Sequence, residues 1–93
     1  MKAQITATHT LWLDEWMGSI LPAVPWSDSL PGTGICYVTD HGGKLVPNVW
    51  SEVALGPFDA RYYRAAYDHA TRALAAITPS SQFTPFDQLA WVP

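Results

Sequence analysis

The residues most able to do chemistry in this sequence are the single cysteine and three histidines. Cys36 could in principle form a thiolate–imidazole pair with His41 or His69. Asp40 would then orient the imidazole, as carboxylates do beside catalytic histidines. However, Cys36 lies in a run of β-branched and aromatic residues, where a lone cysteine usually behaves as a small buried apolar side chain. No glycine-flanked nucleophile turn surrounds it, and the sequence therefore predicts no catalytic residues.

The tetrapeptide Asp40-His41-Gly42-Gly43 allows two interpretations. In the first, His41 is a general base or metal ligand and Asp40 holds it in place. In the second, the segment is a hairpin turn in which Asp40 binds backbone amides and the glycines adopt positive φ. No other residue in the sequence completes a site around His41, so the pattern favours the turn.

A metal or cofactor site has little support in the sequence. His9, His41 and His69 are widely spaced, and no HxH, HxxxH or CxxC pair is present. Gly32-Thr33-Gly34 is too short for a phosphate-binding loop and is followed by a strand pattern rather than a helix. One cysteine also excludes an internal disulfide. We therefore expect no metal and no cofactor.

Tryptophan is abundant, with five residues in 93. Tryptophan is enriched at the centres of protein interfaces and is rarely buried completely. Trp16 and Trp50 are expected in the core. The residues expected to contact a partner protein lie in a proline-rich loop, on the long helix predicted below and near the C-terminus; they are Trp26, Asp28, Tyr63, Arg64 and Trp91.

Composition narrows the class of protein. Hydrophobic residues make up 48% and charged residues 14%, against about 25% charged in an average domain. This chain length suits one domain, residues 1–93. The net charge of −3 argues against direct binding to nucleic acid. No membrane-spanning stretch and no signal-peptide pattern is visible, so we expect no membrane contact and a cytoplasmic location.

The clearest predicted element is a helix over residues 57–77. Gly56 can cap its start, Pro57 suits its first position, and Thr78-Pro79 ends it. Its apolar and charged residues fall on opposite faces. The apolar face consists of Tyr62, Tyr63, Ala66, Tyr67, Ala70, Ala73, Leu74 and Ile77.

The other elements are shorter. A hairpin is predicted over residues 35–50, and because Pro47 lacks an amide hydrogen its second strand is expected to be short or at a sheet edge. Alternation predicts a strand over residues 3–11, and helical spacing a short helix over 13–21. Residues 22–34 read as a loop, and 88–92 as a last strand. Together these predict an α+β fold, a small antiparallel sheet packed against one long helix.

Three functions are compatible with this pattern. The first is a small non-enzymatic module that docks on another protein, of the kind that phages and mobile elements use to inhibit host complexes. The second is a structural or assembly protein that associates with itself through an edge strand or aromatic patch. The third is a small enzyme or metal protein using Cys36, Asp40, His41 and His69. The low charge and many aromatic residues favour the first.

Overall fold

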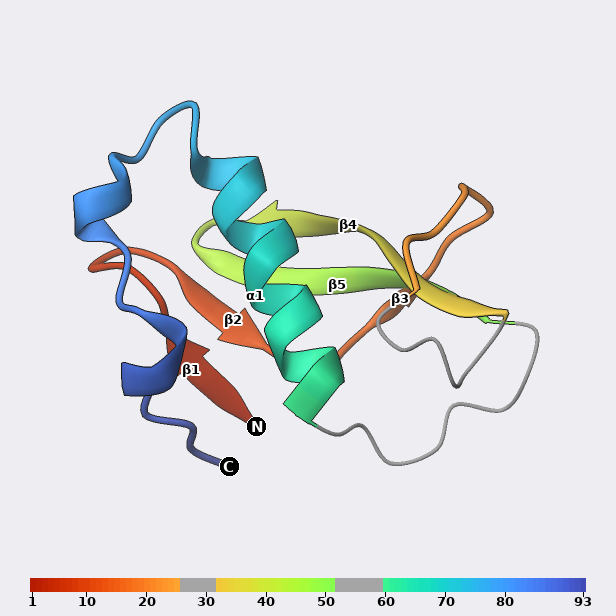
Figure 1. Ribbon diagram of the computed structural model, residues 1–93, viewed down its shortest axis with the longest axis horizontal. Helices are drawn as coiled ribbons and strands as arrows, with labels where there is room; N and C mark the ends of the chain where they lie inside the picture. The colour runs from red at the N-terminus through yellow and green to blue at the C-terminus, as the bar shows by residue number, and fades with distance from the viewer. Residues whose placement is uncertain (26–31, 52–59) are drawn as a thin grey trace.

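The computed structural model describes residues 1–25, 32–51 and 60–93. One helix, α1 (Ala60–Leu74), lies across a five-stranded sheet, which confirms the α+β fold class (Figure 1). The strands are β1 (Lys2–Gln4), β2 (Thr10–Trp12), β3 (Met17–Gly18), β4 (Thr33–His41) and β5 (Lys44–Ser51). Two 3₁₀ turns follow the helix, η1 (Ser80–Gln82) and η2 (Phe86–Gln88).

The predicted hairpin is present as β4 and β5, which pair antiparallel from Thr33–Ser51 to His41–Lys44. Its two-residue turn is of the I′ type, with φ of 65° at Gly42 and 97° at Gly43. The carboxylate of Asp40 accepts the Gly43 amide at 2.7 Å. The interpretation of this segment as a turn is therefore confirmed.

β5 is the central strand of the sheet. It pairs antiparallel with β4 on one side and, on the other, parallel with β2 near Leu45 and with β3 near Val49. The predicted antiparallel sheet is therefore mixed, and the expectation of a short or edge strand was wrong. Pro47 lies between the stretches of β5 that pair with β2 and β3. A residue without an amide hydrogen is tolerated there because no ladder bond is required of it.

The predicted N-terminal strand over 3–11 is two strands. β1 and β2 form an antiparallel pair with Lys2 opposite Trp12. Between them the hydroxyl of Thr6 accepts the amides of Thr8 and His9, and the His9 carbonyl accepts the Ile5 amide. Threonine side chains stabilise turns in this way, so Thr6 reverses the chain where simple alternation predicted a continuous strand.

The predicted helix over residues 13–21 is absent. Its backbone instead bonds to β5: Met17 and Gly18 form β3, and the Ser19 amide donates to the Val49 carbonyl at 3.0 Å. A helix this short needs tertiary packing of its apolar face to be stable. Of the large apolar residues in 13–21 only Leu13 is buried, and Trp16, expected in the core, is 46% exposed.

Helix α1 supplies the main packing surface against the sheet. Its buried side chains meet those of β2, β4, β5 and the residues beside them in one core. The core consists of Ile5, Leu11, Leu13, Ile35, Leu45, Val49, Tyr62, Ala66, Tyr67, Ala70 and Leu74. The predicted cap at Gly56 and Pro57 lies outside the described residues. The helix ends at Leu74 rather than at residue 77. The Thr78 amide donates to the Leu74 carbonyl at 2.8 Å, and Ile77 is left exposed.

The C-terminal tail returns along the helix to the first strand. The hydroxyl of Tyr67 donates to the Thr84 carbonyl at 2.7 Å, and the Thr84 amide donates to the Ile5 carbonyl at 2.9 Å. The strand expected over 88–92 is a single bridge, in which Lys2 and Val92 exchange two backbone hydrogen bonds of 2.7 and 2.8 Å. The preceding residues form the 3₁₀ turn η2 instead of continuing this pairing.

Candidate functional site

The most unusual surface of this protein is the segment that follows β2. Eight large apolar side chains of the described residues are exposed, and five of them lie within residues 16–24. They are Trp16, Met17, Ile20, Leu21 and Val24. We call residues 16–25 the arm; most of it is the orange loop that projects beyond β3 in Figure 1. A concentration of exposed apolar side chains in one segment is typical of a contact surface.

The arm is held at both ends by backbone hydrogen bonds. β3 attaches its start to β5. Near its end, Val24 and Ile35 exchange two hydrogen bonds of 3.1 Å, and the Cys36 thiol donates to the Leu21 carbonyl at 3.1 Å. Gly34 makes this approach possible, because a Cβ there would lie 2.7 Å from the Val24 carbonyl oxygen. The arm is therefore a fixed projection of the sheet rather than a free loop.

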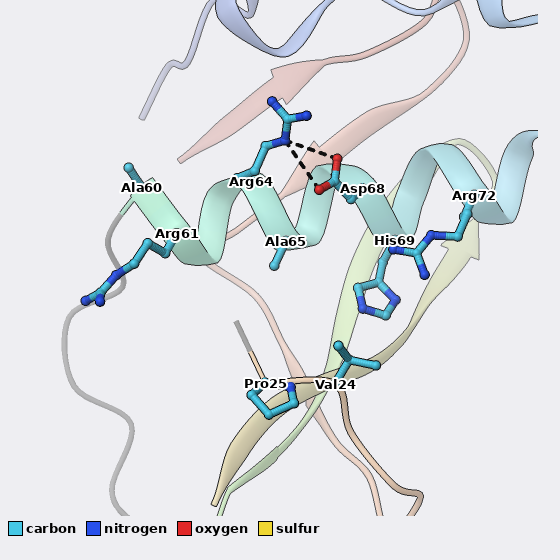
Figure 2. A pocket seen from close by; sticks show the side chains of 9 residues that line it. All are labelled: Val24, Pro25, Ala60, Arg61, Arg64, Ala65, Asp68, His69 and Arg72. Carbon is cyan, nitrogen blue, oxygen red and sulfur yellow. Dashed lines mark hydrogen bonds and ion pairs between the residues drawn. The ribbon is translucent and has the colours of Figure 1, made fainter. Parts of the chain in front are cut away.

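A pocket of about 460 Å³ separates the arm from α1. Val24 and Pro25 form one wall, and the opposite wall is the polar face of the helix (Figure 2). On that wall, Figure 2 shows His69 directed toward Val24 and the Arg72 side chain extending back along the helix toward His69. The pocket's other lining residues in the described ranges are Ala60, Arg61, Arg64, Ala65 and Asp68. The pocket thus joins apolar residues of the arm to a cationic stretch of helix.

The charges around this pocket are unevenly matched. Arg64 and Asp68, which both line the pocket, bond to each other through the Arg64 Nε at 3.2 Å (Figure 2). Partial burial lowers the pKa of His69 below its usual 6.5, and the nearby Arg72 guanidinium lowers it further, against a smaller opposing effect of Asp68. A neutral imidazole beside an arginine leaves this end of the pocket positively charged near neutral pH.

A second pocket, of about 280 Å³, lies on another side of the arm. Ile20, Leu21, Pro22 and Ala23 line it together with Trp50 of β5. Gly32, Thr33 and Pro25 complete its described lining. Trp50, expected in the core, is only partly buried and supplies an aromatic surface here. The arm is therefore flanked by two hollows, one mainly apolar and one bearing positive charge.

Three of the predicted partner-binding residues come together elsewhere, where the tail meets α1. The rings of Tyr63 and Trp91 are 5.1 Å apart, and Phe86 lies 6.4 Å from Trp91. The guanidinium of Arg64 lies over Phe86, 5.2 Å from its centroid. These partly buried rings pack against the core, so their first role is to hold the tail on the helix. Trp26 and Asp28 lie outside the described residues.

The residues considered for catalysis do not form one group. Within the described ranges, no hydrogen bond or ion pair joins Cys36, His41 and His69. Cys36 and His41 are five residues apart on one strand, or about 16 Å at the usual rise. No group of three metal-binding side chains is found among the residues that the structure describes.

Asp40 instead pairs with a histidine that the sequence did not connect to it. His9 Nε2 lies 3.0 Å from Asp40 Oδ2, and His9 Nδ1 lies 2.8 Å from the Thr8 hydroxyl. The Gly43 amide lowers the pKa of Asp40 below 3.8, and His9 lowers it further. Hydroxyl, imidazole and carboxylate in line resemble a hydrolase triad. Neither pocket includes these residues, however, and the contacts fasten the β1–β2 turn to the hairpin.

Sequence reasoning missed the arm because it assigned residues 13–21 to a helix. The informative signal was present: Ile20 and Leu21 precede Pro22, and Val24 precedes Pro25. An apolar run interrupted by prolines cannot bury its side chains through helical or strand periodicity. Apolar residues in such a segment are left at the surface, as they are here.

Comparisons with protein-family models, with curated proteins and with solved structures found no match for this chain. In the described residues, no helix has both the length and the apolar character needed to cross a membrane. The fold and the candidate site therefore define the protein only as a small α+β domain with an exposed apolar arm.

Proposed function

We propose that this protein is a non-enzymatic module that docks on another protein through its arm. The observation that carries the proposal is the cluster of five exposed apolar side chains in residues 16–24. Burying such a surface against a partner is favourable by roughly 25 cal/mol per Å² before the costs of association are counted. The arm is also preorganised by its bonds to β4 and β5, which reduces the entropy lost on binding.

A different protein is favoured over a second copy as the occupant. The positively charged end of the pocket next to the arm needs an acidic counterpart, and the arm itself carries no charged residue between positions 16 and 25. Two arms facing each other would leave both pockets without a counter-charge. Covering a surface of the partner is sufficient for an inhibitor, which requires no chemistry of its own.

The test compares three forms of the protein as bait in a lysate of the source organism or its host. The arm variant carries Ile20→Ser and Leu21→Ser, and the control variant carries Ile77→Ser, an exposed apolar position outside the arm. Ile20 is 98% exposed, so both variants should keep the stability of the original chain within about 0.5–1 kcal/mol. We expect one protein to be retained stoichiometrically by the original chain and by the control, and lost by the arm variant.

Two results would contradict the proposal. Equal retention of that protein by the arm variant would show that docking uses another surface. Recovery of the bait alone, with sedimentation showing a dimer that the arm variant abolishes, would identify a second copy as the occupant. Circular dichroism of all three forms checks that the fold is unchanged.

A further inference from the structure

We propose that the partner's docking segment carries an acidic side chain and that Arg72 binds its carboxylate in the pocket between α1 and the arm. This inference rests on the proposed function and adds the chemistry of the partner. Arg72 was not among the residues selected from the sequence. Arg64, which was selected, also lines this pocket, but its guanidinium is paired with Asp68.

Arg72 stands apart from the other cationic side chains. Lys2 and Lys44 lie over the ring of Trp12 at 4.2 and 4.3 Å, and Lys44 also binds Glu15 at 2.7 Å. Arg64 is paired with Asp68. Arg72 is exposed and makes no hydrogen bond or ion pair with any residue of the described ranges. Its guanidinium is therefore available for a carboxylate, which it can bind through two parallel hydrogen bonds.

The position of Arg72 links it to the arm. Val24 and Pro25 belong both to the arm and to one wall of the pocket, and Arg72 lies on the opposite wall with its guanidinium beside His69 (Figure 2). A segment that covers Val24 and Pro25 with apolar side chains thus reaches Arg72 with a neighbouring side chain. The apolar wall partly excludes water, which strengthens an ion pair relative to one on an open surface.

A protein carboxylate fits this arrangement better than a nucleic-acid phosphate. Binding a phosphate backbone requires several cations along a track, whereas the chain as a whole carries a charge of −3. Here one unpaired arginine lies beside apolar residues of the arm. That combination matches an acidic side chain flanked by apolar ones.

His69 gives the pocket a second means of recognition. The charged groups near it are Arg72 and Asp68 on its own helix, and the arm faces it with uncharged Val24 and Pro25. A bound carboxylate would offset the repulsion from Arg72 and raise the pKa of His69. Binding would then be coupled to proton uptake, so affinity is expected to increase as the pH falls from the pKa of His69 in the complex to its lowered pKa in the free protein.

The experiment selects a displayed library of random peptides on the original chain and measures the affinity of the peptides it enriches. We expect enriched peptides to combine Leu, Phe or Trp with Asp or Glu. Replacing the acid of the best peptide with its amide should weaken binding to the original chain by about fivefold. The same replacement should have no effect on the Arg72→Gln variant. The Lys2→Gln variant, changed at a cation outside the pocket, should behave as the original chain does.

The outcomes separate this inference from the proposed function. The proposal of an acidic partner is overturned if the enriched peptides contain no acidic residue. It is also overturned if replacing the acid with its amide weakens binding to the Arg72→Gln variant as much as binding to the original chain. Neither result contradicts docking through the arm. Peptides that bind equally to the Ile20→Ser, Leu21→Ser variant overturn docking through the arm. A selection that enriches no peptide, or single-stranded DNA that competes through Arg72, overturns the acidic peptide as the occupant. Loss of the pH dependence in His69→Gln would support the role of His69.

Discussion

In the β4–β5 hairpin, Leu45 and Val49 are buried in the core with the side chains of helix α1, whereas Ile20 and Leu21 of the arm are exposed to solvent. The two regions contain similar residues and are hydrogen-bonded to each other through β3 and Val24. They differ in regularity: β5 alternates its side chains between two faces of a sheet, and the arm is interrupted by glycine and prolines. Apolar content alone therefore does not predict burial; the side chain must also be placed between the sheet and the helix.

The largest contrast between the two regions should come from one substitution made in both. Leu45→Ala removes a fully buried side chain and should lower the free energy of unfolding by about 2–5 kcal/mol. Leu21→Ala should change it by less than about 0.5 kcal/mol, because the side chain is half exposed. Urea denaturation of the two variants measures both effects. A large loss of stability in Leu21→Ala would show that the arm is part of the core.

A smaller effect is expected where the two regions touch. A Cβ at Gly34 would lie 2.7 Å from both the Ala23 Cβ and the Val24 carbonyl oxygen. Gly34→Ala should therefore displace the arm, cost about 1–3 kcal/mol and weaken partner binding. Gly18→Ala is the control for stability, since nothing lies within 4 Å of its added Cβ. Thermal unfolding of both variants and the peptide affinity of Gly34→Ala check this, and a Gly34→Ala variant with unchanged stability and affinity would mean that the contact at Gly34 does not position the arm.

The smallest effect on stability is expected from the ionised carboxylate of Asp40 in the hairpin turn. The arm contains no charged residue. Because the pKa of Asp40 is lowered in the folded state, its ionised form stabilises the fold above pH 3.8, and this contribution disappears as the pH falls through the folded-state pKa. Asp40→Asn should lose less stability than the original chain over that acidic range. Denaturation midpoints across the range measure the difference, and identical pH profiles would exclude a stabilising role for the charge.

The elements that follow one regular pattern could be predicted from sequence. The amphipathic period of α1 and the turn residues 40–43 each suffice locally, because side chain and backbone preferences agree there. The order of strands could not be predicted. Which strands pair with β5 depends on contacts between distant residues such as Leu11 and Leu45, and on the location of Pro47 between two partners.

The candidate site was predictable only in part. The aromatic residues Tyr63 and Trp91 were selected by type and do meet, although they meet to hold the tail against α1. The arm was missed because Trp16, Ile20 and Leu21 have helical spacing, and spacing cannot show that the backbone is bonded to β5. The isolation of Arg72 is visible only once the partners of the other cations are known.

The bridge between Lys2 and Val92 has a practical consequence for attaching this protein to anything else. It places the two marked ends of the chain side by side, while the arm projects from the other part of the sheet (Figure 1). A bead, a fluorescent reporter or a fused domain attached at either end is thus anchored at nearly the same point. A fusion at the N-terminal end and a fusion at the C-terminal end should therefore both leave the arm accessible, and a label can be moved from one end to the other without covering the arm.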